Sequence, residues 1–207
     1  MNCDLIARWY RWMEYVSFGG ALHRRRCHFL PELRGKRVLL LGDGDGRFLA
    51  EFSRRYPETD VDSVDCSAAM LRLAEQRTRG NAHVRFHQRD VRTEPIPGDA
   101  YDLIITHFFL DCFTLEEIGP IVEKISATAA PDARWVISEF SEPSNGWRRL
   151  RARFWIHFLY FCFALLTGLE AHQLPDYSVE LRKQGFIRKQ RDEASQGLLA
   201  SELWQRS

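Results

Sequence analysis

The sequence lacks the closely spaced cysteines and histidines that mark a metal centre or a disulfide scaffold. Its five cysteines are far apart and include no C-x-x-C pair, and its seven histidines form no metal-binding pattern with them. We therefore expect no bound metal. Dispersed single cysteines are typical of proteins in a reducing compartment, so a cytoplasmic location is predicted.

An excess of charge of one sign is also absent. The formal net charge is +1, which excludes a broadly basic surface of the kind that binds nucleic acid. The arginine cluster at 148–153 is too local to form such a surface. We expect a small molecule as the partner and no nucleic acid.

Long hydrophobic runs are missing as well. The longest apolar stretch, Phe154–Leu169, is interrupted by His157; as a helix it would extend roughly 24 Å, less than the hydrocarbon core of a bilayer. We interpret residues 147–176 as an apolar helical lid, with His157 and Tyr160 as candidates to contact a substrate. A helix lying on a membrane surface through 147–169, with its arginines on lipid phosphates, is the second interpretation. An ordinary buried helix remains open.

What the sequence does contain is one alternating series of strands and helices over residues 1–207, with enough apolar residues for a sizeable core. The apolar run Val38–Leu41 is followed by the glycine loop Gly42–Gly46, a helical pattern, and a second strand-like run that ends in Asp65. This order is typical of the first half of a nucleotide-binding parallel sheet. Asp65 is placed to accept hydrogen bonds from ribose hydroxyls.

The loop composition discriminates between nucleotide ligands. The third glycine of a dinucleotide fingerprint would stand at Arg47, and the loop lacks the GK[ST] of a phosphate-binding loop. Asp43 and Asp45 would repel a pyrophosphate but not a ligand that carries an ammonium and a sulfonium. The loop therefore favours S-adenosylmethionine, with S-adenosylhomocysteine as the product, over NAD, FAD or ATP. A polar turn without a ligand is the simpler alternative, and Asp65 argues against it.

The remaining elements complete an α/β chain that ends in a hairpin. Residues 4–30 are predicted to form a helical cap divided at Gly19-Gly20, and Ser67 is a plausible N-cap for a helix that runs to about Thr78. The further elements are strands at 82–87, 101–106 and 133–138 (the last after a turn at Pro131-Asp132), helices at 114–128 and 177–185, and hairpin strands at 185–192 and 198–204.

Further candidates for the cofactor site follow the second and third strands. Cys66 and Met70 lie one helical turn apart beside Asp65, where soft side chains can pack on adenine; core packing is an equal alternative for Met70. Asp90 can accept a hydrogen bond from the adenine amino group while the amide of Val91 meets a ring nitrogen, and a turn carboxylate is an equal alternative. In the N-terminal cap, Tyr10 is a candidate to line the cofactor site, and Tyr15 the substrate site.

Three polar residues follow the central strands at their carboxyl ends, where ligands bind in open sheets. His107 and Asp111 come after the strand at 101–106, and Glu139 ends the next strand. His107 and Glu139 are candidates for a general base, and Asp111 is a candidate to contact the substrate. The alternative is that His107 only contacts the cofactor and that Glu139 caps a loop.

With these motifs in place, the sequence resembles the class I S-adenosylmethionine-dependent methyltransferases over almost the whole chain. The successive motifs of this family are similar to residues 38–46, 64–71, 90–91 and 101–104. The ubiquinone/menaquinone C-methyltransferase (type 11) branch resembles this chain at residues 6–10 and 17–19. The resemblance implies a Rossmann-like, doubly wound seven-stranded sheet with the last strand antiparallel and helices on both faces. It also implies methyl transfer, with Asp65 on ribose, Asp90 on adenine and the glycine loop beside the methionine moiety. The aromatic N-terminus and the apolar stretch Phe154–Leu169 favour a small apolar or amphipathic acceptor, and the accepting atom, carbon, oxygen or nitrogen, stays open.

Two positions depart from the family pattern. The acid that usually stands two residues before the first glycine is Leu40, and we expect Asp43 or Asp45 to replace it; the acid that usually follows the N-terminal tyrosine is Arg11. The departure at Leu40 keeps open a non-catalytic protein that binds S-adenosylmethionine or a protein partner. An NAD-dependent oxidoreductase is a third reading.

Overall fold

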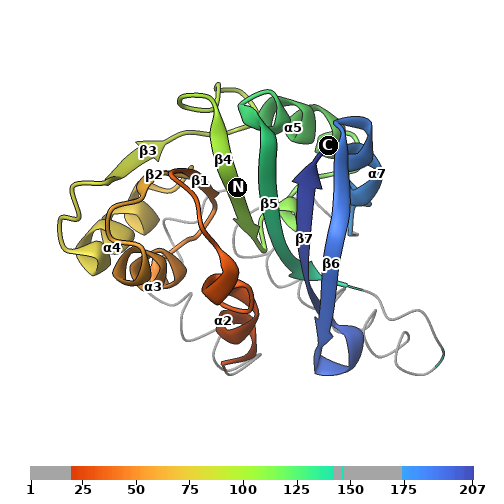
Figure 1. The fold of residues 1–207 in the computed structure, drawn as a ribbon, viewed down its shortest axis with the longest axis horizontal. Coiled ribbons are helices and arrows are strands. Elements are labelled where there is room, and N and C mark those ends of the chain that lie inside the picture. The colour runs from red at the N-terminus through yellow and green to blue at the C-terminus, as the bar shows by residue number, and fades with distance from the viewer. Residues whose placement is uncertain (1–19, 142–145, 147–173) are drawn as a thin grey trace.

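The computed structural model describes residues 20–141, 146 and 174–207. These residues form a seven-stranded sheet with the strand order β3-β2-β1-β4-β5-β7-β6 (Figure 1). β7 runs antiparallel to both β5 and β6, whereas the remaining neighbours pair in parallel. The predicted fold class, including the antiparallel last strand, is confirmed.

The strands are β1 (Arg37–Leu41), β2 (Asp60–Asp65), β3 (Val84–Gln88), β4 (Tyr101–His107), β5 (Ala129–Phe140), β6 (Phe186–Ala194) and β7 (Leu199–Arg206). The α-helices are α2 (Ala21–Arg26), α3 (Arg47–Arg55), α4 (Ala68–Thr78), α5 (Ile118–Ser126) and α7 (Tyr177–Lys183). Three short 3-10 helices are η1 (Leu30–Glu32), η2 (Leu110–Cys112) and η3 (Ser195–Gly197).

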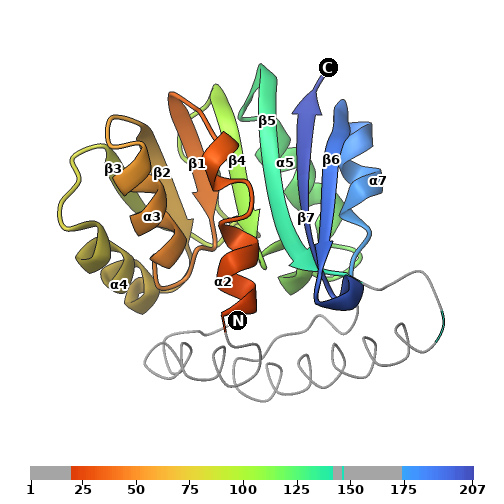
Figure 2. The same ribbon diagram turned by 60° about the horizontal axis from the view of Figure 1, so that its bottom comes forward.

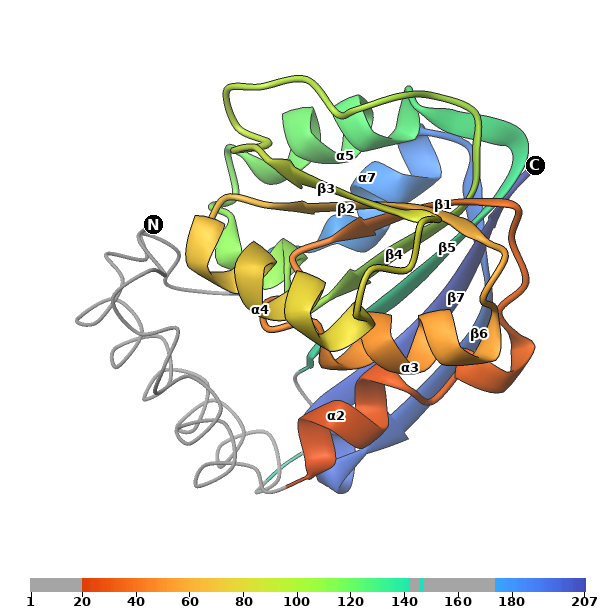
Figure 3. The ribbon, with the colours of Figure 1, turned by 90° about the vertical axis from the view of Figure 1, so that its left-hand side faces the viewer.

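Helices cover both faces of the sheet, with α2, α3 and α4 on one face and α5 and α7 on the other (Figures 2 and 3). Alternate residues of β1 point to opposite faces, so Val38 packs with the α3 side chains and Leu39 with those of α5. Each apolar side chain buried in this way stabilises the fold by about 1.5–3 kcal/mol. The continuous apolar run of β1 is therefore explained by burial on both faces.

Several element boundaries differ from the sequence predictions by one or two residues, and the starts of β5 and α5 differ by four. β5 begins at Ala129, so Pro131-Asp132 lies inside the strand, where the register with β4 shifts between Tyr101 and Leu103. A bulge of this kind tolerates a proline that has no N–H for the ladder. α5 begins at Ile118. Before it, the Thr114 N–H donates to Glu117 Oε2 at 2.9 Å and the Glu117 N–H donates to Thr114 Oγ1 at 3.3 Å, so residues 114–117 form a hydrogen-bonded turn. Leu115, which falls within the predicted helix 114–128, lies in this turn and is 55% exposed.

Several predictions fall on residues outside the described part of the chain. They concern the lid over 147–173, most of the N-terminal cap, and the side chains of Tyr10, Tyr15, His157 and Tyr160. α2 begins directly after Gly20, as expected for the second half of the cap, but it ends at Arg26. Within the described residues, no helix has the length and apolar character needed to cross a membrane.

Candidate active site

The three glycines of the loop after β1 all have positive φ angles, which L side chains adopt only with strain. A Cβ at Gly42 would lie 2.4 Å from Cδ2 of Phe109, and one at Gly46 would lie 2.4 Å from Cα of Ala74. A Cβ at Gly44 would meet no atom within 4 Å. Gly42 and Gly46 are therefore required for packing within the protein, whereas Gly44 faces open space that a ligand can approach.

The two carboxylates of the loop have different surroundings. Asp45 accepts hydrogen bonds from Nε of Arg47 and from Nη2 of Arg77, each at 2.9 Å, and so ties α3 to α4. Asp43 is buried; its Oδ2 accepts the Leu49 N–H at 3.0 Å, and its Oδ1 has no hydrogen-bond partner among the described residues. Burial raises the pKa of Asp43 to about 7. Of the two candidates to replace the acid missing at Leu40, the geometry favours Asp43.

The segment after β2 has the predicted local structure. Asp65 Oδ1 accepts the Ser67 N–H at 2.8 Å, and the Ser67 hydroxyl caps α4 by accepting the Met70 N–H at 3.2 Å. α4 ends at Thr78, as the sequence predicts. Met70 is buried, and Cys66 is half-buried. Burial, together with the nearby Asp65, raises the pKa of the Cys66 thiol to about 11, so it is a neutral side chain suited to packing.

Asp90 lies at the neighbouring strand end, since β3 pairs in parallel with β2. Its Oδ1 accepts the Arg92 N–H at 3.0 Å, and its carbonyl accepts the Glu94 N–H at 2.8 Å, so Asp90 organises a turn. The Asp90 side chain is 39% exposed, whereas Val91 is buried in the core. Asp90 therefore stabilises a turn, which was the alternative weighed for it. Its hydrogen bond to the adenine amino group stays a prediction.

His107, at the end of β4, is fully buried against the edge of Phe48, with ring centroids 4.7 Å apart. Neither ring nitrogen has a hydrogen-bond partner among the described residues. Burial, with a contribution from the charge of Arg26, holds the pKa of His107 well below its usual value. At neutral pH the ring is therefore an uncharged imidazole.

Glu139 and Asp111 form a pair of buried carboxyls beside the ends of β4 and β5. Oε1 of Glu139 accepts hydrogen bonds from the N–H groups of Phe109 at 3.0 Å and Leu110 at 2.8 Å, so it caps η2. This is the loop-capping role that was the alternative to a catalytic one. Burial raises the pKa of Asp111 to about 6. Burial and the nearby Asp111 raise the pKa of Glu139 well above its usual range. Because two adjacent buried carboxyls do not both ionise readily, the pair retains a proton near neutral pH.

Arg26 was not identified from the sequence. This residue lies on α2, and its side chain is buried near Asp43 and Asp111. It is 4% exposed, and its guanidinium carbon lies 5.3 Å from the Phe108 ring centroid. Its charge lowers the pKa of Asp43 and of Asp111, in each case opposing the larger effect of burial. The sequence feature that could have indicated this burial is the run Arg24-Arg25-Arg26. Three consecutive side chains on a short helix cannot all be exposed when one face of that helix packs on the sheet.

The comparisons with known proteins agree with this arrangement. Residues 38–132 match the family model described as a methyltransferase domain. Over 148 residues the chain is 35% identical to the ubiquinone/menaquinone biosynthesis C-methyltransferase UbiE of Azotobacter vinelandii and 30% identical to that of Stutzerimonas stutzeri. The chain belongs to the class I S-adenosylmethionine-dependent methyltransferases. The family predicted from the motifs is confirmed.

The alignments with these UbiE proteins include 68% of this methyltransferase chain and 57% of each relative's length. Among solved structures, a TehB-like SAM-dependent methyltransferase from Corynebacterium glutamicum matches with a TM-score of 0.65 at 16% identity, covering 97% of this chain and 98% of that one. The N-methyltransferase NodS from Bradyrhizobium japonicum, solved with S-adenosyl-L-homocysteine, matches with a TM-score of 0.62 at 13% identity, covering 90% and 84%. At these identities the structures establish the fold.

Proposed function

We propose that this protein binds S-adenosylmethionine on the loop after β1 and transfers its methyl group to a small, apolar or amphipathic acceptor. The observation that carries the proposal is the loop itself. Gly44 leaves room for a ligand, and the buried Asp43 beside it has one carboxylate oxygen without a hydrogen-bond partner among the described residues. A cationic ligand fits this position better than a phosphate because the loop offers a carboxylate.

In this proposal the residues around the loop bind and orient the cofactor. Asp43 faces the ammonium of the methionine moiety, Arg26 supplies a positive charge for its carboxylate, and Asp65 accepts hydrogen bonds from the ribose. Gly42, Gly46 and Asp45 shape the loop, while Cys66 and Met70, together with Asp90 and Val91, border the adenine. Tyr10 is proposed to cover the cofactor from the N-terminal cap.

S-adenosylmethionine supplies a methyl carbon that its sulfonium already activates for displacement. The protein then has to hold the acceptor in line with that carbon, and positioning alone contributes roughly 7–11 kcal/mol to such a reaction. An acceptor that carries a proton also needs a base. Glu139 and Asp111 fit this role better than His107. The raised pKa values of the two carboxyls make the ionised member of the pair able to accept a proton near neutral pH, whereas the lowered pKa of His107 makes it a weak base.

The acceptor site is proposed to lie beyond His107, lined by Asp111, Tyr15, His157 and Tyr160 and closed by the apolar segment 147–176. The related proteins named ubiquinone/menaquinone biosynthesis C-methyltransferase support an apolar acceptor. An apolar lid with arginines at 148–153 also supports contact with a membrane surface through 147–169. The free cysteines at 27, 66 and 112 support a cytoplasmic location.

The proposal is tested by calorimetry with S-adenosylhomocysteine and by transfer of a labelled methyl group to components of a cell extract. Binding and transfer are both expected. Binding without transfer to any component would favour the non-catalytic alternative. Binding of NADH in place of S-adenosylhomocysteine would contradict the proposal and favour an oxidoreductase.

A further inference from the structure

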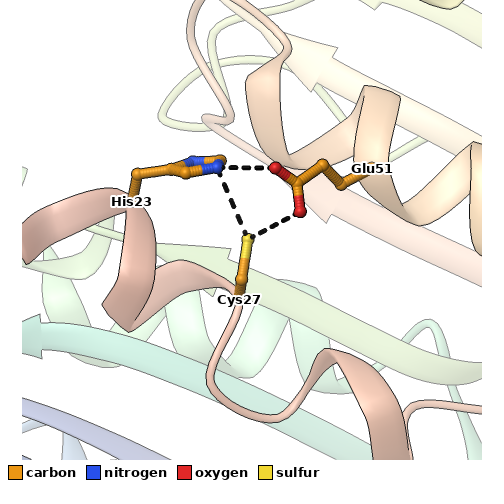
Figure 4. Close-up of side chains that lie close together, drawn as sticks. All are labelled: His23, Cys27 and Glu51. Carbon is orange, nitrogen blue, oxygen red and sulfur yellow. Dashed lines mark hydrogen bonds and ion pairs between the residues drawn. The ribbon is translucent and has the colours of Figure 1, made fainter. Parts of the chain in front are cut away.

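The structure brings together three side chains that sequence spacing left apart. His23 lies on α2, Cys27 follows the end of that helix, and Glu51 lies on α3 (Figure 4). Nε2 of His23 is 2.8 Å from Oε1 of Glu51, and Sγ of Cys27 is 3.8 Å from that Nε2 and 3.6 Å from Oε2 of Glu51. One nitrogen, one sulfur and one carboxylate oxygen thus lie within 4.8 Å of one another.

We propose that His23, Cys27 and Glu51 bind one zinc ion, at a site separate from the glycine loop. Zinc bonds of about 2.0–2.3 Å in a tetrahedron place ligand atoms about 3.4–3.6 Å apart. The two distances from Cys27 Sγ, 3.8 and 3.6 Å, already match this spacing. The pair His23–Glu51 would separate by about half an ångström as the metal replaces their hydrogen bond, a movement within reach of two partly exposed side chains.

The chemistry of the three groups selects zinc over the hard cations. Thiolate and imidazole favour zinc, whereas magnesium and calcium prefer oxygen ligands. On binding, the Cys27 thiol releases its proton to solvent and the sulfur bonds to the ion, so that thiolate and carboxylate together balance the two positive charges. His23 contributes a neutral nitrogen and leaves that balance unchanged.

An open cleft of about 520 Å³ lies beside the cluster and is lined by His23 and Glu51 together with side chains of α3 and α4. We assign the fourth coordination position to this cleft, from which solvent reaches the ion. Arg47, Arg77 and Arg79 also line this cleft. Arg47 and Arg77 are ion-paired with Asp45, which offsets much of their repulsion of a cation. Three protein ligands with an open fourth position are typical of zinc sites that hold a water molecule.

The site would fasten α2 to α3. α2 also carries Arg26, so zinc would hold in place the helix that delivers this buried charge toward the glycine loop. Metal binding by this cluster does not require methyl transfer at the glycine loop.

The test is titration of the full chain, stripped of metal by a chelator, with cobalt(II) as a spectroscopic probe and then with zinc as the competitor. We expect one cobalt ion per chain, a thiolate-to-cobalt charge-transfer band, and visible bands of a four-coordinate ion, all displaced by zinc. Cys27→Ser should abolish the charge-transfer band. His23→Gln and Glu51→Gln should each weaken zinc binding at least tenfold.

Cys112→Ser is the matched control, because this half-buried thiol lies outside the cluster and should leave the titration unchanged. Circular dichroism melting of each metal-free variant establishes that it is folded. A wild-type chain that binds no cobalt would overturn the proposal. So would a folded Cys27→Ser variant that keeps the charge-transfer band, since another cysteine would then be the ligand.

Discussion

The Asp43 carboxylate accepts the Leu49 N–H at 3.0 Å, so a residue of the glycine loop is fastened to the first turn of the helix that follows it. The first N–H groups of a helix have no partner within the helix and carry partial positive charge. Oδ2 satisfies one of them, which holds the carboxylate in place and leaves Oδ1 available. The loop and α3 therefore orient a buried acid together. In the family an acid usually comes from the strand, at the position that Leu40 occupies in this chain.

Replacing Asp43 by Asn should weaken binding of S-adenosylhomocysteine at least tenfold, because the amide lacks the charge that faces the ammonium. The wild-type affinity should rise with pH through about 7 as Asp43 ionises, and this rise should be absent from the variant. Calorimetry across this pH range measures both effects. Asp45→Asn, which removes the charge of a carboxylate already paired with two arginines, is the control and should retain most of the affinity.

The same substitution should change stability with the opposite pH trend. Burial raises the folded-state pKa of Asp43 from 3.8 to about 7, so the folded protein keeps this proton where the unfolded chain has lost it. The free energy of unfolding then falls as pH rises between these values. Asp43→Asn should remove that loss, which urea denaturation at several pH values measures. An equal pH slope in both proteins would contradict the assignment.

Two glycine substitutions should separate ligand binding from packing. Gly44→Ala places its methyl group in open space, so it should lower stability by only the strain of its positive φ, about 1–2 kcal/mol, while it blocks the cofactor. Gly46→Ala adds a clash with the Ala74 backbone and should be several times more destabilising. Thermal melting and S-adenosylhomocysteine binding measure the two effects. Equal loss of stability in both variants would mean that Gly44 is also a packing residue.

Glu139→Gln should lower the methyl-transfer rate at least tenfold while it leaves cofactor affinity nearly unchanged. Glutamine keeps an oxygen to accept the N–H groups of Phe109 and Leu110 but removes the ionisable partner of Asp111. The limb of the pH–rate profile that reports this carboxyl pair should also disappear. His107→Gln is the comparison and should reduce the rate less. A Glu139→Gln enzyme with full turnover and an unchanged profile would leave Glu139 only its loop-capping role.

Asp62 should be a main electrostatic support of the sheet edge. Burial alone would raise its pKa, but hydrogen bonds from Arg85, His87 and Tyr101 outweigh this and lower the pKa to about 2. Its stabilisation is complete above the unfolded-state value of 3.8 and is lost as pH falls toward about 2.

Asp62→Asn should lower the free energy of unfolding at neutral pH by on the order of 2–3 kcal/mol. Urea denaturation measures this difference, which should shrink in acid. Asp60→Asn is the matched control: Asp60 and its partner His83 are both about half exposed, so the change should be below about 1 kcal/mol. A loss from Asp62→Asn that stays constant down to the acid range would contradict the electrostatic origin.

The parts predicted well from sequence are those determined by local backbone requirements. The alternating glycines indicated the loop, the apolar run Val38–Leu41 indicated β1, and Ser67 was correctly identified as the cap of α4. The predicted starts of β5 and α5 were wrong. β5 continues through a register shift against β4, and residues 114–117 form a turn held by Thr114–Glu117 hydrogen bonds before α5 begins. The burial of Arg26 and the distinction between Asp43 and Asp45 were also beyond the sequence, since both depend on contacts with other elements.

The sequence by itself determined the order of elements, the glycine loop, and the positions of Asp65, Asp90, His107 and Glu139 at strand ends, because strand period, helix period and glycine conformation are properties of a few adjacent residues. Only the tertiary structure decided which loop carboxylate has an unpaired oxygen among the described residues, that Arg25 and Arg26 are buried, and that His23, Cys27 and Glu51 meet. Those outcomes require α2, α3 and the sheet to pack together, which places residues distant in the chain within bonding range and removes them from water.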